Sequence, residues 1–286
     1  MLLGNKLKLA ALIGLALPIT AVNALAALVV RSGSAADVAG ITAFRDQFRA
    51  DLGGGITAGA NGLFNDGVNQ RREINWDAVP DLFSAPNNLP ANFFNVNSPR
   101  GVVFSTPGSG FMLSATLAAV GLTGINFGNI DPSYATTFSP FSAPRLFTAL
   151  GSSVTDVNFF VPGTTVASAT RGFGVIFSDV GLVGSTGLQF FDSNGVLLGS
   201  ATAPAARSGF SFLGAFSDNG TSPIAKVRIT SGNAVLGAGV TDNGTTRDLV
   251  VMDDFLFSNP APEPGTLGLV AIASAAALLL RRRMAR

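Results

Sequence analysis

Short runs in which apolar and polar residues alternate fill the chain from residue 101 onward, and they are rich in Val, Ile, Phe and Thr. In the run 224–230, Val227 and Ile229 face one way while Lys226 and Arg228 face the other, as in a strand with one buried face. Turn residues separate the runs without any long helical pattern, which argues against a parallel α/β sheet. We expect strands at 102–105, 145–150, 154–161, 173–177, 188–191, 196–201, 210–216, 224–230 and 249–257. The pattern predicts a mainly β fold, an antiparallel β-sandwich of the jelly-roll type over residues 101–259.

One amphipathic helix is expected before the strands. Apolar residues recur at steps of three and four from Val38 to Leu52, which is the spacing of one helix face. Asp37 stands where it can cap the first turn, and the Gly-Gly-Gly run at 53–55 would end the helix. Each arginine of this segment has an aspartate nearby, so we expect its apolar face to pack on the body of the protein rather than on a membrane.

The helix belongs to a loop-rich region at 27–100, where Gly, Asn, Asp and Pro are frequent and only 71–76 reads as a short strand. The 23 Phe residues are expected mainly in the core between two sheets, because a large rigid ring fills that space. The pairs expected there are 159–160, 190–191, 210 with 212, and 255 with 257.

The first 26 residues have the order of a cleaved signal peptide. Lys6 and Lys8 are followed by an apolar run and then by the small-residue site Ala24-Leu25-Ala26. An uncleaved anchor is the alternative, because residues 27–30 prolong the apolar stretch, and a later cleavage at 34–36 is also open.

The last 27 residues, 260–286, have three parts in a fixed order, and we call them the sorting tail. Pro262, Glu263 and Pro264 are followed by the uncharged segment 265–280. At about 1.5 Å per residue this segment spans about 24 Å as a helix, close to a bilayer core of about 30 Å. A basic cluster closes the chain and should remain on the cytoplasmic side: Arg281, Arg282, Arg283 and Arg286.

This order of motif, apolar helix and basic cluster resembles the PEP-CTERM sorting signal of Gram-negative bacteria. The resemblance implies that an exosortase, a membrane transpeptidase, recognises and removes the tail, and that the body reaches the cell surface or the extracellular matrix. A permanent membrane anchor is the alternative. The body also resembles a group of exported bacterial proteins without an assigned activity, in the stretches 71–77, 159–163, 171–174 and 251–255.

Composition limits the chemistry that the body can perform. The chain has no Cys and no His, which excludes disulfides, Cys/His zinc sites, thiol nucleophiles and a Ser-His-Asp relay. Only two Glu are present, and Glu73 is the one outside the sorting tail, so a glycosidase would need two Asp or Glu73 with one Asp. We therefore expect no enzyme. Without the basic residues of the two termini and Glu263, 12 basic residues face 16 acidic ones, which disfavours nucleic acid as a partner.

Two places in the body stand out as candidate sites. Trp76, beside Asn75 and Asp77, is a candidate ligand contact, although a Trp that fixes a loop onto the sandwich is the plainer interpretation. Asp253 and Asp254 interrupt an apolar strand, so at least one carboxylate points toward buried surroundings and needs a partner. Their position resembles that of an Asp near a structural Ca²⁺ in jelly-roll carbohydrate-binding modules; hydrogen bonds to backbone N–H groups are the alternative.

The sequence thus predicts an exported surface or matrix protein that is not an enzyme and that binds extracellular polysaccharide. A purely structural scaffold is the alternative. No cofactor is expected apart from that structural Ca²⁺.

Overall fold

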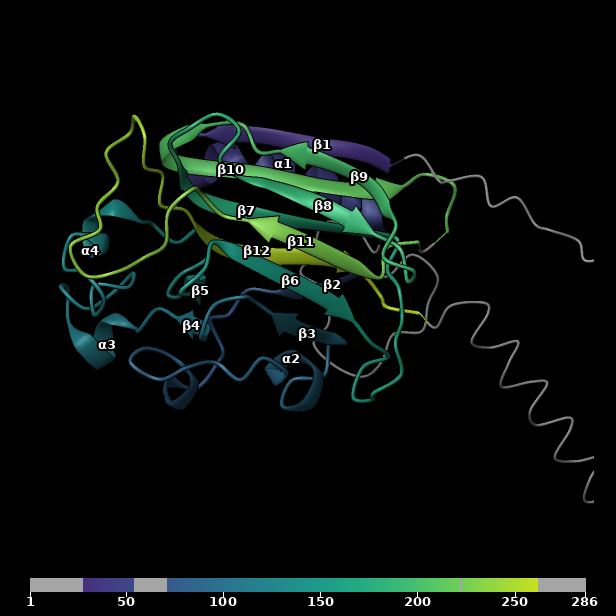
Figure 1. The fold of residues 1–286 in the computed structure, drawn as a ribbon, viewed down its shortest axis with the longest axis horizontal. Coiled ribbons are helices and arrows are strands. Elements are labelled where there is room, and N and C mark those ends of the chain that lie inside the picture. Colours follow the sequence, from purple (N-terminus) through teal and green to yellow (C-terminus); the bar gives the residue numbers. More distant parts are fainter. Residues whose placement is uncertain (1–27, 54–70, 222, 262–286) are drawn as a thin grey trace, which may run out of the picture.

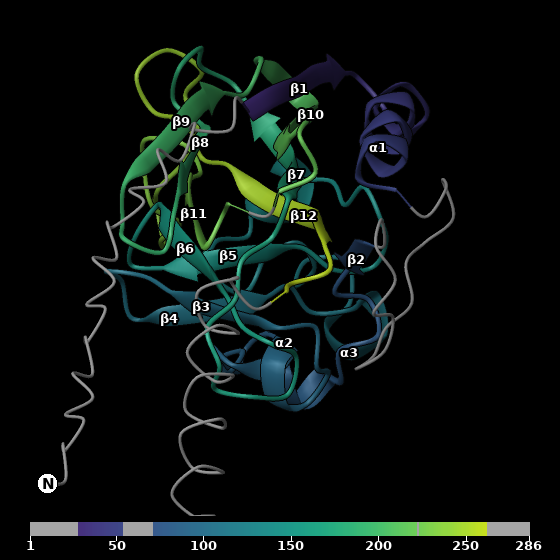
Figure 2. The ribbon, with the colours of Figure 1, turned by 90° about the vertical axis from the view of Figure 1, so that its right-hand side faces the viewer.

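The structure, a computed structural model, describes residues 28–53, 71–221 and 223–261. Two antiparallel sheets pack face to face, and one helix covers the outer side of the larger sheet (Figures 1 and 2). The helices are α1 (Val38–Leu52), the 3-10 turn η1 (Asp81–Phe83), α2 (Phe93–Val96), α3 (Leu117–Val120) and α4 (Tyr134–Thr137). The fold is therefore mainly β, as the sequence predicts, and it is built as a sandwich.

The larger sheet has seven strands in the order β1-β10-β7-β12-β5-β4, and β2 also pairs with β12. Its strands are β1 (Leu28–Ala35), β2 (Arg71–Ile74), β4 (Gly110–Leu113), β5 (Phe147–Leu150), β7 (Gly172–Val180), β10 (Ala206–Ser217) and β12 (Val251–Ser258). Strand β12 pairs with β5 at Met252 and with β2 from Phe255 onward, so both neighbours share one of its edges.

The smaller sheet has five strands in the order β3-β6-β11-β8-β9. They are β3 (Val102–Ser105), β6 (Val154–Phe159), β8 (Gly187–Phe191), β9 (Leu197–Thr202) and β11 (Lys226–Thr230). Figure 1 looks onto the side of this sheet that faces away from the larger sheet, and we call that side the outer face. In the upper part of Figure 2, strands β8, β9 and β11 of the smaller sheet lie on the left, β10, β7 and β12 of the larger sheet in the middle and α1 on the right.

Every strand predicted from residue 101 onward is present, β3 with the predicted ends and the others with shifted ends, and the island at 71–76 forms β2. Two strands, β1 and β4, were not predicted. The sequence places the residues of β1 in the loop-rich region after the signal peptide, because the apolar start of β1 directly follows the apolar run of the signal peptide. Strand β1 pairs instead with β10 over its whole length, from Leu28 opposite Ser217 to Ala35 opposite Phe210. The region 27–100 was expected to precede the sandwich, but it contributes β1 and β2 to the larger sheet.

Helix α1 has the predicted ends and a narrower buried stripe than predicted. The Oδ1 atom of Asp37 accepts a hydrogen bond from Gly40 N at 2.8 Å, and Gly53 follows the last turn with φ at 96°. Ile41, Phe48 and Leu52 are buried, and the other stripe residues, Val38 and Phe44, are 41% and 38% exposed. The helix packs against β10, β7 and β12 through Phe48, whose ring lies 5.2 Å from that of Phe212.

The core between the sheets is rich in Phe, as predicted. Of the eight Phe expected there, four are buried between the sheets: Phe159, Phe190, Phe255 and Phe257. Phe210 and Phe212 are also buried, but they lie on the opposite face of the larger sheet, under helix α1. The other two, Phe160 and Phe191, are only half-buried. Strand alternation explains this correction, because the second residue of each adjacent pair must point to the outer face.

Candidate functional site

The outer face of the five-stranded sheet carries two rows of side chains that run across the strands. Strand pairing aligns the first row as Ser105, Asp156, Arg228, Gln189 and Ser200. It aligns the second row as Val103, Asn158, Lys226, Phe191 and Leu197. All ten residues are exposed or half-buried, whereas the residues that alternate with them on β6, β8 and β11 are buried. The outer face is thus a polar, solvent-facing surface that all five strands build.

An ion pair orders the middle of the first row. Arg228 donates from Nε to Oδ1 of Asp156 at 2.7 Å and from Nη2 to Oδ2 at 2.8 Å. These hydrogen bonds raise the pKa of the Arg228 guanidinium. Gln189 lies directly opposite Arg228 on β8 and is exposed. The two charges of the ion pair compensate each other. The pair also holds the planar guanidinium of Arg228 beside the exposed amide of Gln189, and both groups can form hydrogen bonds with a ligand that carries hydroxyl groups.

The second row presents polar groups only at its Asn158 and Lys226 positions, between apolar residues on the outer strands. Asn158 donates from Nδ2 to Val103 O and to Ser105 Oγ, both at 3.2 Å, which orients its amide. In the part of the chain that the structure describes, no group donates to Oδ1 of Asn158. The Nζ atom of Lys226 lies 4.5 Å from the centre of the Phe191 ring, so the ring fixes the ammonium group.

A hollow of about 430 Å³ opens beside the middle of this second row, where β6 and β8 end and β11 begins, and we call it the sheet-end hollow. Asn158 and Lys226 form its wall on the sheet side, and the half-buried Phe160 continues that wall. Ser168 and Asp192 come from the two neighbouring loops. The hollow therefore combines a cation, a carboxylate, an amide, a hydroxyl and an aromatic ring.

Trp76, the predicted ligand contact, is a core residue instead. It is 1% exposed, and its ring stacks on Phe147 with a centroid distance of 4.3 Å and an interplanar angle of 6°. Its Nε1 donates to the carbonyl oxygen of Asp253 at 3.0 Å. The residue borders a second hollow of about 360 Å³, but a ring that is buried cannot serve as a platform for a sugar. Trp76 fixes its loop onto the sandwich.

Asp253 and Asp254 are both buried, and Asp253 finds its partners in the loop before β5. Oδ2 of Asp253 accepts from Phe141 N at 2.6 Å and from Ser142 N at 3.2 Å, and Ser142 Oγ donates to Oδ1 at 3.0 Å. The same hydroxyl lies 2.8 Å from Oδ1 of Asp254. Burial and the neighbouring Asp254 raise the pKa of Asp253 well above its usual range, and burial raises that of Asp254.

These surroundings do not fit calcium well. Ca²⁺ takes six to eight oxygen ligands from several segments, whereas the groups around Asp253 are mainly N–H and O–H donors. Within residues 28–53, 71–221 and 223–261, no cluster of three or more acidic residues is placed to hold a metal ion. The pair is also shut off from solvent, since Asp253 is 0% and Asp254 4% exposed.

Asp77 extends this buried acidic region toward the surface. Its Oδ1 atom accepts from Arg145 N at 3.4 Å. Burial, assisted by the charge of Asp254, raises the pKa of Asp77 to about 6. Loss of hydration on burial is thus the main cause of the raised pKa of Asp77.

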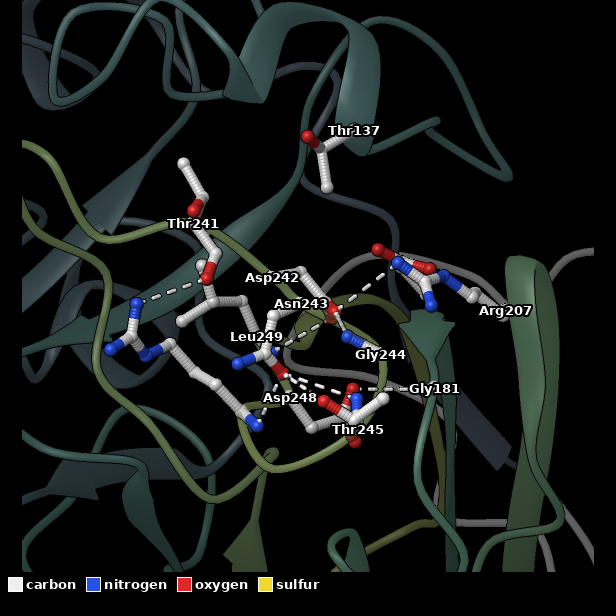
Figure 3. Close-up of polar contacts among 12 residues, drawn as sticks. Thr137, Gly181, Arg207, Thr241, Asp242, Asn243, Gly244, Thr245, Asp248 and Leu249 are labelled. Carbon is white, nitrogen blue, oxygen red and sulfur yellow. Dashed lines mark hydrogen bonds and ion pairs between the residues drawn. The ribbon is translucent and has the colours of Figure 1, made fainter.

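A further group of buried aspartates anchors the long loop before β12 (Figure 3). Asp248 is 0% exposed and accepts from Gly181 N at 2.8 Å, Leu182 N at 3.2 Å and the Ser185 hydroxyl. Asp242 accepts from Gly244 N at 2.6 Å and Leu249 N at 3.3 Å, and it lies 3.6 Å from Arg207 Nη2. Both carboxylates accept hydrogen bonds from backbone N–H groups, so these aspartates stabilise the turns of the loops around them.

The residues of the sorting tail, Pro262, Glu263 and Pro264 with Arg281, Arg282, Arg283 and Arg286, lie outside the described residues, as do residues 1–26. Among residues 28–53, 71–221 and 223–261, no helix has the length and apolar character to cross a membrane. The expected membrane segment, 265–280, is not among them.

The rows on the outer face were missed from the sequence. The alternation of Lys226 and Arg228 indicated that both point away from the core, but it could not place Asn158, Gln189 or Asp156 beside them. Those neighbours come from strands far apart in the chain, whose pairing a single sequence does not show.

Comparisons of the chain with protein-family models, with curated proteins and with solved structures find no match. The outer face and the sheet-end hollow are the surface best equipped for a polar ligand.

Proposed function

We propose that this protein is exported and binds extracellular polysaccharide through the outer face of its five-stranded sheet. The observation that carries this proposal is the pair of cross-strand rows, which line up amide, guanidinium, carboxylate, ammonium and hydroxyl groups on a solvent-facing surface. Sugar hydroxyls both donate and accept hydrogen bonds, so a chain of sugars can use the polar groups of both rows.

The strand order supports a jelly-roll fold for the body. Numbered one to eight along the chain, β5 to β12 take the order 1-8-3-6 in the larger sheet and 2-7-4-5 in the smaller. Two interlocked Greek keys of this kind form the jelly roll, which lectin domains also use. Fold alone does not assign function, so the topology supports the proposal only beside the outer face.

Export and sorting remain proposals from the sequence. Strand β1 favours a cleavage at Ala24-Leu25-Ala26 over one at 34–36, because the later cleavage would remove a strand that pairs with β10 over its whole length. The PEP-CTERM-like tail would then bring the body to an exosortase and to the surface or matrix of a Gram-negative bacterium. We propose no catalysis, since the buried carboxyl pair Asp253 and Asp254 has no access to a substrate.

A structural scaffold is the competing role. It would need no ligand, and the same outer face would then be an ordinary solvated surface. The two roles differ in whether the exported protein retains polysaccharide.

Affinity electrophoresis of the exported protein through gels that contain the host's extracellular polysaccharide tests the binding proposal. A retarded band supports binding, and unchanged mobility in every polysaccharide gel supports the scaffold.

For sorting, deletion of Pro262–Arg286 should release the body into the medium, whereas unchanged membrane fractionation would contradict the tail's proposed role.

A further inference from the structure

We infer that the sheet-end hollow holds one neutral sugar ring of the bound polysaccharide, with Lys226 and Asp192 as its main polar contacts. This inference rests on the proposed function and names the class of ligand. The hollow is continuous with the second row of the outer face, since Asn158 and Lys226 belong to both.

The size of the hollow suits one or two sugar units. Its volume of about 430 Å³ lies in the range of about 300–1,000 Å³ that is usual for small-molecule sites. The rest of the polysaccharide can continue along the rows, because the hollow opens onto the sheet and is not enclosed by it.

The polar groups at the hollow complement a pair of neighbouring hydroxyls. Lys226 lines the hollow and offers N–H donors, and it takes part in none of the ion pairs among the described residues. Oδ1 of Asp192 accepts from Asn194 N at 2.9 Å and Val196 N at 2.8 Å, which fixes the carboxylate and leaves Oδ2 as an acceptor. The Oδ1 atom of Asn158 adds a second acceptor. A donor and two acceptors match hydroxyls that give and take hydrogen bonds.

Two further features indicate a ligand at this place. The Ser168 hydroxyl is buried and has no hydrogen-bond partner among the described residues. A buried polar group is rarely left unpaired in a native protein, and such a group requires an explanation. Phe160, half-buried at the wall, offers an apolar surface on which the C–H side of a sugar ring can pack.

The charge balance points to a neutral sugar. The lining of the hollow has one cationic and one anionic side chain, Lys226 and Asp192, so its formal net charge is zero. On the adjacent row the ion pair with Asp156 compensates the charge of Arg228. The body without its termini has 12 basic and 16 acidic residues, so its overall field repels polyanions. A chain of uronic acids would meet no excess of positive charge on this face.

The test uses the exported protein and the host's extracellular polysaccharide, separated by anion exchange into a neutral pool and an acidic pool. We expect the neutral pool to bind, with affinity unchanged between low and high salt because no net charge is neutralised. Lys226→Met keeps the stem of the side chain and removes the donors, and should weaken this binding about tenfold. Arg247→Met, an exposed change on another loop, is the matched control and should bind like the wild type.

The outcomes separate the two claims. Binding of the acidic pool alone, with a steep salt dependence, would overturn the neutral ligand and leave the proposed function standing. Binding of the neutral pool with Lys226→Met unaffected, and with an unchanged melting temperature, would remove the hollow as the binding place. Absence of binding to both pools would overturn the proposed function itself.

Discussion

The ring of Phe48 lies so close to Gly174 that a Cβ atom on this glycine would stand 2.7 Å from Cε1 of Phe48. Gly214 pairs with Gly174 on the neighbouring strand, and a Cβ atom on it would stand 2.9 Å from Cε2 of the same ring. The Phe48 ring of helix α1 therefore rests on two glycines of the seven-stranded sheet, with the rings of Phe212 and Phe216 beside it. This contact allows the helix to cover that sheet and leaves the other side of the sandwich open to solvent.

Gly174→Ala should destabilise the protein by about 1–3 kcal/mol, the usual cost of overpacking a filled site. The added methyl group meets a ring that is itself buried, so neither can move aside freely. Gly237→Ala is the control, because its Cβ would meet only Val240 Cγ2 at 3.4 Å. Thermal unfolding of both variants measures the effect, and equal melting temperatures would contradict the docking account.

Trp76, the sole tryptophan, reports on the core. Trp76→Ala should cost about 3–5 kcal/mol, because it empties a large buried site and leaves the Asp253 carbonyl without its donor. In the wild type, the fluorescence emission should be that of a dry environment and should not change when polysaccharide is added. A shift at saturating polysaccharide would restore Trp76 as a ligand contact.

Asp77 should make stability depend on pH. Burial raises its folded pKa to about 6 from a usual value of 3.8, so its contribution is full below about pH 4 and is lost as pH rises through about 6. Asp77→Asn cannot ionise and keeps an acceptor for Arg145 N. The melting temperature of this variant relative to the wild type should therefore increase from pH 4 to pH 7. A difference that stays constant over this range would show that Asp77 does not ionise differently on folding.

Calcium should not contribute to stability at Asp253. The carboxylate already accepts hydrogen bonds from two backbone N–H groups and the Ser142 hydroxyl. We expect the same melting temperature in excess Ca²⁺ and in excess chelator. A lower melting temperature with chelator, restored by Ca²⁺, would support the metal site that the sequence suggested.

The exported protein should begin at or before Leu28. A start at residue 35 or later would remove strand β1 and expose the edge of β10. Mass spectrometry of the N-terminal peptide decides this. A mature chain that begins after Ala36 would contradict the role of β1 in the sheet.

The sequence predicts the helix and every strand of the body except β4, because their signals are local. Alternation, turn residues, the Asp37 cap and the glycines after Leu52 act within a few residues. Strand β1 was missed because its apolar start merges with the leader, and only its pairing with β10 reveals it.

The candidate site was harder to predict because it depends on strand pairing. Asp156 and Arg228 are 72 residues apart in the chain, yet their side chains form a two-point ion pair. Trp76 shows the opposite error, since a lone aromatic residue among polar neighbours suggested a surface contact, while the fold closes around it.

The polysaccharide affinity of outer-face variants tests the central claim most directly. Asn158 and Gln189 lie in adjacent rows and point away from the core, so replacing both with Ala should leave the melting temperature nearly unchanged. Gln47→Ala on α1, beyond the other sheet, is the matched control (Figure 2). We expect the Asn158→Ala/Gln189→Ala protein to bind the host's polysaccharide at least about tenfold more weakly than the wild type and the Gln47→Ala protein to bind like the wild type. Equal affinity of all three proteins would contradict a binding role for the outer face.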